Sequence, residues 1–130
     1  GAKSGYDELN LIEVGKNYGW PVIQGVESKA GMIMPIVESG GNETWAPAGM
    51  AYYNNSLFFA GLRGESLYEA KILAGNKVSR KAHFREEFGR IRAVVLSPDN
   101  FLYITTSNTD GRGSSDPNDD KIIRINPKLF

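Results

Sequence analysis

Two arginines, Arg90 and Arg92, are the residues of this sequence whose type and spacing most clearly suggest chemistry. They stand two positions apart at the start of an expected β-strand, so their side chains should project to the same side. A guanidinium group binds a carboxylate through two parallel hydrogen bonds, and a pair of such groups suits a ligand with several carboxylates. The alternative is a solvated pair at the start of a strand.

Arg63 is a third candidate cation. It ends the segment Gly61-Leu62-Arg63, which follows an expected strand, and it precedes Gly64. It could bind the same anionic ligand as the arginine pair, or it could be an ordinary residue of the turn. The sequence favours neither interpretation.

Oxygen donors are concentrated in Asn108–Asp119, a polar segment that could bind a cation. No glutamate closes it as in an EF-hand loop, so a mobile polar loop near a site is the favoured interpretation. His83 is the single histidine, and its place in an expected outer strand predicts a surface or half-buried side chain rather than a general base. The absence of cysteine excludes thiol catalysis, disulfides and zinc–thiolate sites.

The charge balance argues against several partners. The 130 residues carry 15 basic and 15 acidic side chains, so no basic excess points to nucleic acid. No apolar stretch approaches the length of a transmembrane helix, which predicts no membrane insertion. The chain begins with Gly1 and shows no signal peptide, and we expect it to be part of a longer polypeptide.

Short apolar runs separated by turn residues predict an all-β fold. An isolated strand is expected at Leu9–Val14 and a long loop at 24–44, with at most one helical turn at Arg85–Phe88. The remaining expected strands fall into two groups: Gly49–Tyr53, Ser56–Gly61, Ser66–Leu73 and Lys77–Phe84, then Ile91–Leu96, Phe101–Thr106 and Lys121–Asn126.

The start of the second group follows the start of the first by about 40–45 residues, the repeat length of a β-propeller blade. We therefore expect residues 1–44 to be the end of one blade with a long loop, 45–89 one four-stranded antiparallel blade, and 90–130 a last blade that need not be complete. Two blades alone leave open edges. Missing blades, or other copies of the chain closing a ring, should cover them.

Six motifs stand in the same order as in the PQQ-dependent soluble aldose sugar dehydrogenases of the glucose/sorbosone dehydrogenase family, which this chain resembles along essentially its whole length. They are Gly5–Ile12, Gly15–Pro21, Trp45–Tyr53, Leu57–Arg63, Arg90–Arg92 and Ser97–Tyr103. The resemblance implies the C-terminal portion of a six-bladed β-propeller.

It also implies an activity, the oxidation of the anomeric hydroxyl of an aldose with hydride transfer to PQQ (pyrroloquinoline quinone) and with calcium polarising the quinone. The general base of the family is a histidine in an earlier blade. We therefore expect no catalytic residue within this chain, and no activity from it alone. The resemblance further implies a periplasmic or extracellular location.

The resemblance assigns candidate ligands residue by residue. PQQ carries three carboxylates, and the positions matching its contacts are Gly61, Leu62, Arg63, Arg90, Ile91 and Arg92. The matching calcium positions are Glu8 and Tyr18, at least partly through main-chain oxygens. For the side chains of Tyr18 and Trp20, packing under the propeller face is the favoured alternative.

Two departures from the family pattern support a second interpretation. The segment Val26–Gly31 lacks the tyrosine that often touches PQQ, and Gly1–Ser4 lacks a proline common there. A non-enzymatic binding module on a propeller scaffold would show such losses.

Overall fold

The computed structural model describes residues 5–130, so the expectation for Gly1–Ser4 lies outside the described residues. The chain is all-β, and every strand pairing is antiparallel. Its strands are β1 (Glu8–Leu9), β2 (Val37–Glu38), β3 (Pro47–Tyr53), β4 (Ser56–Gly61), β5 (Ser66–Ile72), β6 (Val78–His83), β7 (Ile91–Leu96), β8 (Leu102–Thr106) and β9 (Ile122–Ile125). Short 3₁₀ turns are η1 (Ala74–Asn76) and η2 (Pro127–Leu129). None of the helices in residues 5–130 is long and apolar enough to span a membrane.

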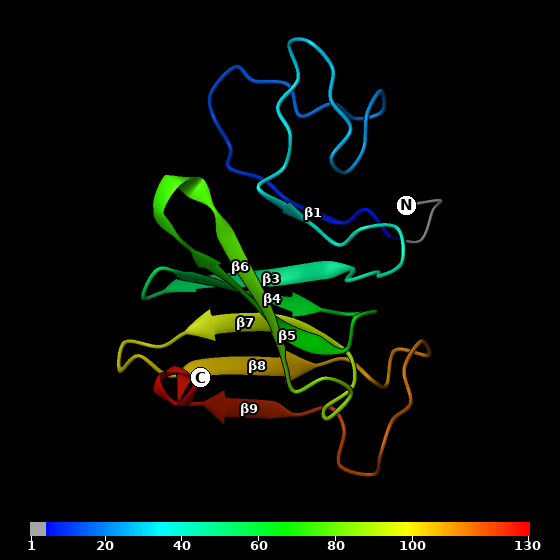
Figure 1. Ribbon diagram of the computed structural model, residues 1–130. Coiled ribbons are helices and arrows are strands. Elements are labelled where there is room, and N and C mark those ends of the chain that lie inside the picture. The colour runs from blue at the N-terminus through cyan, green and yellow to red at the C-terminus, as the bar shows by residue number, and fades with distance from the viewer. Residues whose placement is uncertain (1–4) are drawn as a thin grey trace.

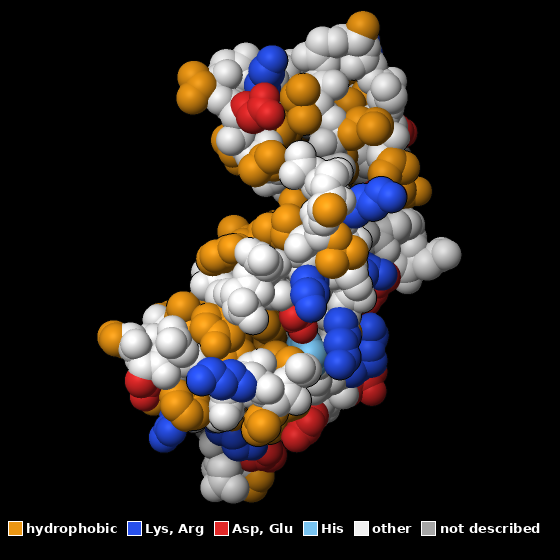
Figure 2. All heavy atoms as spheres, turned by 60° about the vertical axis from the view of Figure 1, so that its left-hand side comes forward, with side chains coloured by type: hydrophobic (Ala, Val, Ile, Leu, Met, Phe, Trp, Pro, Cys, Tyr) orange, Lys and Arg blue, Asp and Glu red, His pale blue; other side chains and the backbone are white. Residues whose placement is uncertain are grey.

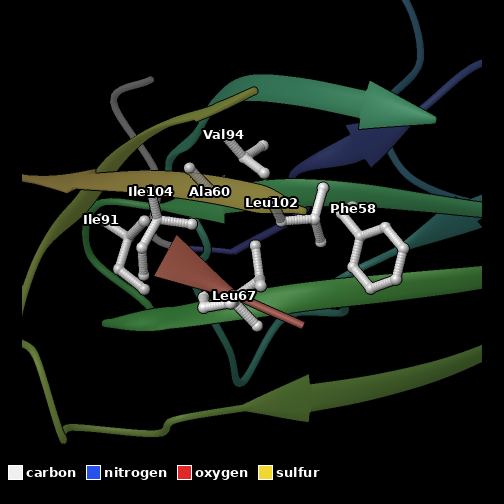
Figure 3. Packing of buried hydrophobic residues seen from close by; sticks show 8 residues of the cluster. Phe58, Ala60, Leu67, Ile91, Val94, Leu102 and Ile104 are labelled. Carbon is white, nitrogen blue, oxygen red and sulfur yellow. The ribbon is translucent and has the colours of Figure 1, made fainter. Parts of the chain in front are cut away.

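Two sheets form the body of the molecule, a four-stranded sheet β3-β4-β5-β6 and a three-stranded sheet β7-β8-β9. They stack face to face, with β3 and β4 against β7 (Figure 1). Alternating apolar positions fill the space between them with Phe58, Ala60, Leu67, Ile91, Val94, Leu102, Ile104 and Ile125 (Figure 3). At Gly49 the backbones nearly touch, because an added Cβ would lie 2.9 Å from the Cα of Ala93.

The opposite face of the four-stranded sheet packs on Trp45, a fully buried residue. Its ring lies 5.2 Å from that of Phe59 and 5.4 Å from that of Tyr68, between centroids. Asp7 fixes the start of β3 from the other side, because its Oδ2 accepts hydrogen bonds from the main-chain N–H groups of Trp45 (2.7 Å) and Ala46 (3.0 Å). The short sheet β1-β2 therefore covers this face, and residues 10–36 project beyond it as a loop region (Figure 1).

The expected all-β architecture of a partial propeller is confirmed, and one open edge is visible in it. Strand β9 pairs with β8 alone, and within residues 5–130 no strand lies along its other edge. The first sheet has a fourth strand, β6, at the corresponding position. Exposed apolar side chains are scattered over the sheets and the loop region, which a notch separates (Figure 2).

Two expected elements are wrong. The strand at Leu9–Val14 shrinks to β1, because its pairing with β2 lasts only two residues and Val14 is fully exposed. The helical turn at Arg85–Phe88 is a turn without helical geometry. Phe84 and Glu86 have positive φ angles (56° and 60°), outside the right-handed helical region.

His83 lies on the outer strand β6, as expected, but it is buried rather than exposed or half-buried. Its Nε2 lies 2.7 Å from Glu69 Oε2, and its ring stacks on Phe130 with centroids 3.9 Å apart. Glu69 Oε1 in turn accepts a hydrogen bond from the Ser56 hydroxyl at 2.7 Å. The histidine is thus part of a polar chain across three strands.

Glu69→Gln is expected to weaken the loss of stability at acid pH. Burial raises the pKa of Glu69, but hydrogen bonds from Ser56 and His83 and the charges of His83 and Lys71 outweigh it and hold the pKa below 4.5. A carboxylate with a lowered pKa stabilises the fold above its unfolded-state pKa, and this contribution is lost as the pH falls through the lowered value. Urea unfolding at several pH values below 4.5 should show a flatter decline for the variant than for the wild type.

Glu87→Gln is the matched control, because Glu87 is exposed and its carboxylate makes no hydrogen bond within residues 5–130. Parallel declines for the wild type and Glu69→Gln would contradict the assignment.

Candidate anion-binding site at one end of the two sheets

Three connections meet at one end of the stacked sheets, on the right in Figure 1. They are residues 62–65 between β4 and β5, residues 84–90 between β6 and β7, and residues 107–121 between β8 and β9. Antiparallel strands of adjacent sheets bring these connections together because alternate turns fall at the same end. All three candidate arginines, Arg63, Arg90 and Arg92, lie in or beside them.

Arg90 is buried and acts as a tie between two of these connections. Its Nε donates to the main-chain oxygen of Ser107 (3.1 Å), its Nη1 to that of Leu62 (3.4 Å), and its Nη2 to Asp110 Oδ2 (3.2 Å). Every nitrogen of the guanidinium group therefore already has a protein partner. Arg90 was predicted as a ligand-binding residue, but its guanidinium group is occupied by hydrogen bonds within the fold.

Arg92 differs from its neighbour, because 53% of its side-chain surface is exposed. Its Nε donates to the Ser107 hydroxyl (3.2 Å), and its Nη2 lies 3.6 Å from Asp110 Oδ2. The two arginines thus converge on one carboxylate. A register shift in β7 between Ile91 and Ala93 accompanies this arrangement, and the Ile91 side chain points into the core.

Asp110 is the site residue that sequence reasoning missed. It appeared there only as one of many oxygen donors in Asn108–Asp119. The main-chain N–H of Arg112 and the guanidinium of Arg90 hold the pKa of Asp110 below its ordinary value of 3.8, so it is ionised at neutral pH. An acidic residue in the polar connection after the next strand, 20 positions beyond Arg90, was the available signal, but sequence spacing alone cannot show that the loop folds back.

Arg63 opens onto a hollow of about 380 Å³. The hollow is lined by Gly41, Asn42, Glu43, Thr44, Arg63, Gly64, Glu65, Arg85 and Glu86. The main-chain N–H groups of Arg63 and Gly64 both donate to the Trp45 oxygen at 3.1 Å, which fixes this turn. The Arg63 side chain is exposed and makes no ion pair with any of residues 5–130, while Gly61 is buried at the end of β4.

Glu43 organises the wall of this hollow. Its carboxylate accepts from the Tyr68 hydroxyl (3.1 Å), Arg80 (3.1 Å) and Arg85 (3.3 Å). Burial raises the pKa of Glu43, but the Trp45 indole, Arg80, Tyr68 and Arg85 outweigh this effect and lower it. Burial and the neighbouring Glu43 carboxylate raise the pKa of Tyr68 to about 12, so the phenol stays protonated and donates.

The connection 107–121 is closed by internal hydrogen bonds. Asp120 Oδ1 accepts from the main-chain N–H of Asn108 (2.6 Å), and its Oδ2 accepts from Thr109 Oγ1 (2.6 Å). Asn108 Nδ2 donates to Asp119 Oδ2 (3.1 Å). These bonds hold the loop against the arginine pair instead of leaving it as an extended polar excursion.

Gly113→Ala is expected to destabilise the fold by about 1–3 kcal/mol through overpacking. A Cβ at Gly113 would lie 2.8 Å from Arg90 Cδ and 2.9 Å from the Cα of Asn108, so the loop would have to move away from Arg90. Chemical denaturation measures the effect. Ser114→Ala, at an exposed position of the same loop, should stay within about 0.5 kcal/mol of the wild type; equal effects of the two changes would contradict the close approach.

The two candidate calcium residues have different surroundings. Glu8 accepts from the Gly25 N–H at Oε1 (2.6 Å) and from Asn10 at Oε2 (3.2 Å), and it lies opposite Glu38 in the β1–β2 pair. The Tyr18 hydroxyl is used locally, because it accepts from the Glu13 N–H and donates to the Leu11 oxygen. No hydrogen bond joins the Glu8 and Tyr18 side chains in the described part of the chain.

The alternative for Tyr18 and Trp20, packing under the propeller face, stays a prediction, and within residues 5–130 the two side chains differ in exposure. Tyr18 is half-buried, but Trp20 is 79% exposed.

Comparisons with known proteins agree with one another. The family model described as Glucose / Sorbosone dehydrogenase matches residues 1–124. The aldose sugar dehydrogenase YliI of Escherichia coli is 31% identical over 144 residues, which cover 95% of this chain. Two solved structures cover 95% of the chain: the PQQ-bound aldose sugar dehydrogenase of Streptomyces coelicolor (37% identity, TM-score 0.83) and a putative oxidoreductase (glucose dehydrogenase) of Thermus thermophilus (35% identity, TM-score 0.85).

The chain spans about a third of the length of these relatives: 36% of the Escherichia coli protein and 37% of each of the two solved chains. The activities of the whole relatives therefore extend to this chain only as a proposal.

Proposed function

Because this chain belongs to the glucose/sorbosone dehydrogenase family, we propose that it is part of a PQQ-dependent oxidoreductase that oxidises aldose sugars. The observation that carries the proposal is the arginine cluster at one end of the sheets. Arg92 presents an exposed guanidinium there, and Arg63 stands at the rim of a polar hollow. A PQQ-bound relative with 37% identity supports the choice of cofactor.

The residues present fit a cofactor with three carboxylates. Arg92 has unused N–H donors on its exposed edge, and Arg63 is a cation without an ionic partner in residues 5–130. These two side chains would hold PQQ by charge-assisted hydrogen bonds. Arg90 would support them from below, because its own donors are engaged. Gly61 and Ile91 would contribute main-chain contacts, since glycine has no side chain and the Ile91 side chain lies in the core, while Leu62 is half-buried.

The chemistry supplied by bound PQQ is the acceptance of two electrons at its quinone. This chain's own task is binding and orientation. Its single histidine does not serve as the base: His83 lies on the outer strand β6, against Glu69 and Phe130. The group that removes the sugar proton therefore belongs to another part of the protein in this proposal.

Calcium fits the surroundings of Glu8 better than those of the Tyr18 side chain. Glu8 and Glu38 face each other in the β1–β2 pair, and like charges directly opposite are unfavourable without a counter-ion. Glu38 Oε2 and Asn10 Oδ1 are buried and have no hydrogen-bond partner among residues 5–130. Carboxylate and amide oxygens are the donors that Ca²⁺ takes. The main-chain oxygens of Glu8 and Tyr18 remain the proposed family-type ligands.

The proposal also covers the substrate, the location and the rest of the propeller. Aldose sugars are the proposed substrates, and a periplasmic or extracellular location is proposed by analogy with the family. The remaining blades of a six-bladed propeller would cover the open edge of β9 and the exposed apolar side chains of the sheets.

A thermal-shift titration with PQQ, with and without calcium, tests the proposal. A ligand that binds only the folded state raises Tm by mass action. The expected result is a calcium-dependent rise that Arg92→Ala abolishes and Arg124→Ala, at an exposed arginine of β9, retains. No rise at saturating PQQ would contradict the proposal and favour a non-enzymatic binding module.

A further inference from the structure

Asp110 lies where a ligand carboxylate would be expected, between Arg90 and Arg92. Its Oδ2 accepts from Arg90 Nη2 at 3.2 Å, from the Ser107 hydroxyl at 3.3 Å, and lies 3.6 Å from Arg92 Nη2. One carboxylate oxygen thus accepts two hydrogen bonds and forms an ion pair with a third group. A pair of arginines facing one ligand would otherwise repel each other, so this residue determines how they are presented.

We propose that Asp110, directly and through Ser107, is a positioning residue that fixes the Arg92 guanidinium for a carboxylate ligand; this inference rests on the proposed function. The Ser107 hydroxyl accepts from Arg92 Nε (3.2 Å) while donating to Asp110. Arg92 is therefore held at two of its nitrogens. Both anchor points lie on the same connection, 107–121.

The geometry leaves a defined part of Arg92 for the ligand. A guanidinium group has five N–H donors, and the two anchors engage Nε and Nη2. The Nη1 edge makes no hydrogen bond with the described residues, 5–130, and the side chain is 53% exposed. A long arginine normally loses rotamer freedom when it binds, and prior fixation removes that cost from the binding step.

Arg90 cannot take the same role, because all of its nitrogens have partners within the fold and its side chain is only 10% exposed. It holds Asp110 instead. Arg90 therefore positions Asp110, Asp110 and Ser107 position Arg92, and Arg92 binds the ligand.

Simple electrostatics and this inference predict opposite results for Asp110→Ala. Removing a carboxylate makes the site more positive, which alone should strengthen the binding of an anion. Loss of positioning should weaken it. We expect the PQQ affinity of Asp110→Ala to be lower by about tenfold or more, the scale of a lost charge-assisted hydrogen bond. The PQQ affinity of Ser107→Ala should also be lower than that of the wild type.

Affinities are measured by fluorescence titration of the protein with PQQ and, separately, with citrate as a plain tricarboxylate. Asp116→Ala is the matched control, since Asp116 lies in the same loop and pairs with Lys121; its affinities should equal those of the wild type. In double-mutant cycles, Asp110→Ala should couple to Arg92→Ala and be additive with Arg63→Ala. Tighter binding by Asp110→Ala, or additivity with Arg92→Ala, would overturn the inference.

A readout without ligand separates this inference from the proposed function. The Arg92 Nε–H signal in an NMR spectrum should shift in Asp110→Ala, and an unchanged signal would overturn positioning. Citrate binding that depends on Asp110, with no binding of PQQ, would overturn the proposed function alone. Failure of the wild type to bind either anion would overturn both.

Discussion

Arg90→Ala is expected to destabilise the protein by about 2–3 kcal/mol, whereas Arg92→Ala should change stability by less than about 0.5 kcal/mol. The first figure rests on two hydrogen bonds to the main-chain oxygens of Leu62 and Ser107 and on the buried stem of the side chain. The Arg92 side chain is 53% exposed and makes one hydrogen bond, to the Ser107 hydroxyl, so its removal should cost much less. Substitutions of these two residues of one motif should therefore lower the free energy of unfolding by clearly different amounts.

Urea unfolding of both variants and of the wild type measures this difference in stability. PQQ titration of the same proteins measures their affinities. Arg92→Ala should fold normally and bind PQQ poorly. Arg90→Ala should lose both stability and binding, because the connections carrying Leu62 and Asp110 separate. Equal stability losses for the two variants would show that Arg90 is not the tie between these connections.

This asymmetry marks how far the sequence could predict the site. The i, i+2 spacing predicted that the two guanidinium groups lie near each other, and both reach Asp110, although Arg90 precedes β7 and the register shifts after Ile91. It could not show that Arg90 is buried. That burial comes from Gly113 and Asn108, which reach Arg90 only because the loop folds back on it. These contacts join residues about 20 positions apart, on either side of β7 and β8, and no local periodicity predicts them.

The fold was predictable where the signals are local. Strands Ser56–Gly61 and Ile91–Leu96 match the expected bounds, because tight turns and alternating apolar residues define them. Leu9–Val14 failed because a partner strand, not propensity, decides how long β1 extends. Arg85–Phe88 failed because the Glu86 N–H bonds to the Glu65 oxygen on another connection, which draws the chain away from a helical path.

Trp45→Ala is expected to be the most destabilising single change, at about 3–5 kcal/mol. Trp45 is fully buried against Phe59 and Tyr68, and Arg80 lies 5.0 Å above its ring. Truncation would remove the aromatic contacts and leave a cavity between the four-stranded sheet and its cover. Trp20→Ala is the matched control, because Trp20 is 79% exposed and its loss should cost less than about 0.5 kcal/mol.

The change should also reach the binding site, because the main-chain oxygen of Trp45 accepts the N–H groups of Arg63 and Gly64. Alanine retains this oxygen, but the segment that carries it, directly before β3, would lose its packing. We therefore expect Trp45→Ala to weaken PQQ binding as well as folding, at temperatures where the variant is still folded. Unfolding curves and PQQ titrations of both tryptophan variants test this. A strongly destabilised Trp45→Ala protein with wild-type affinity would show that the Arg63 turn is held independently of the core, and that Arg92 alone determines recognition.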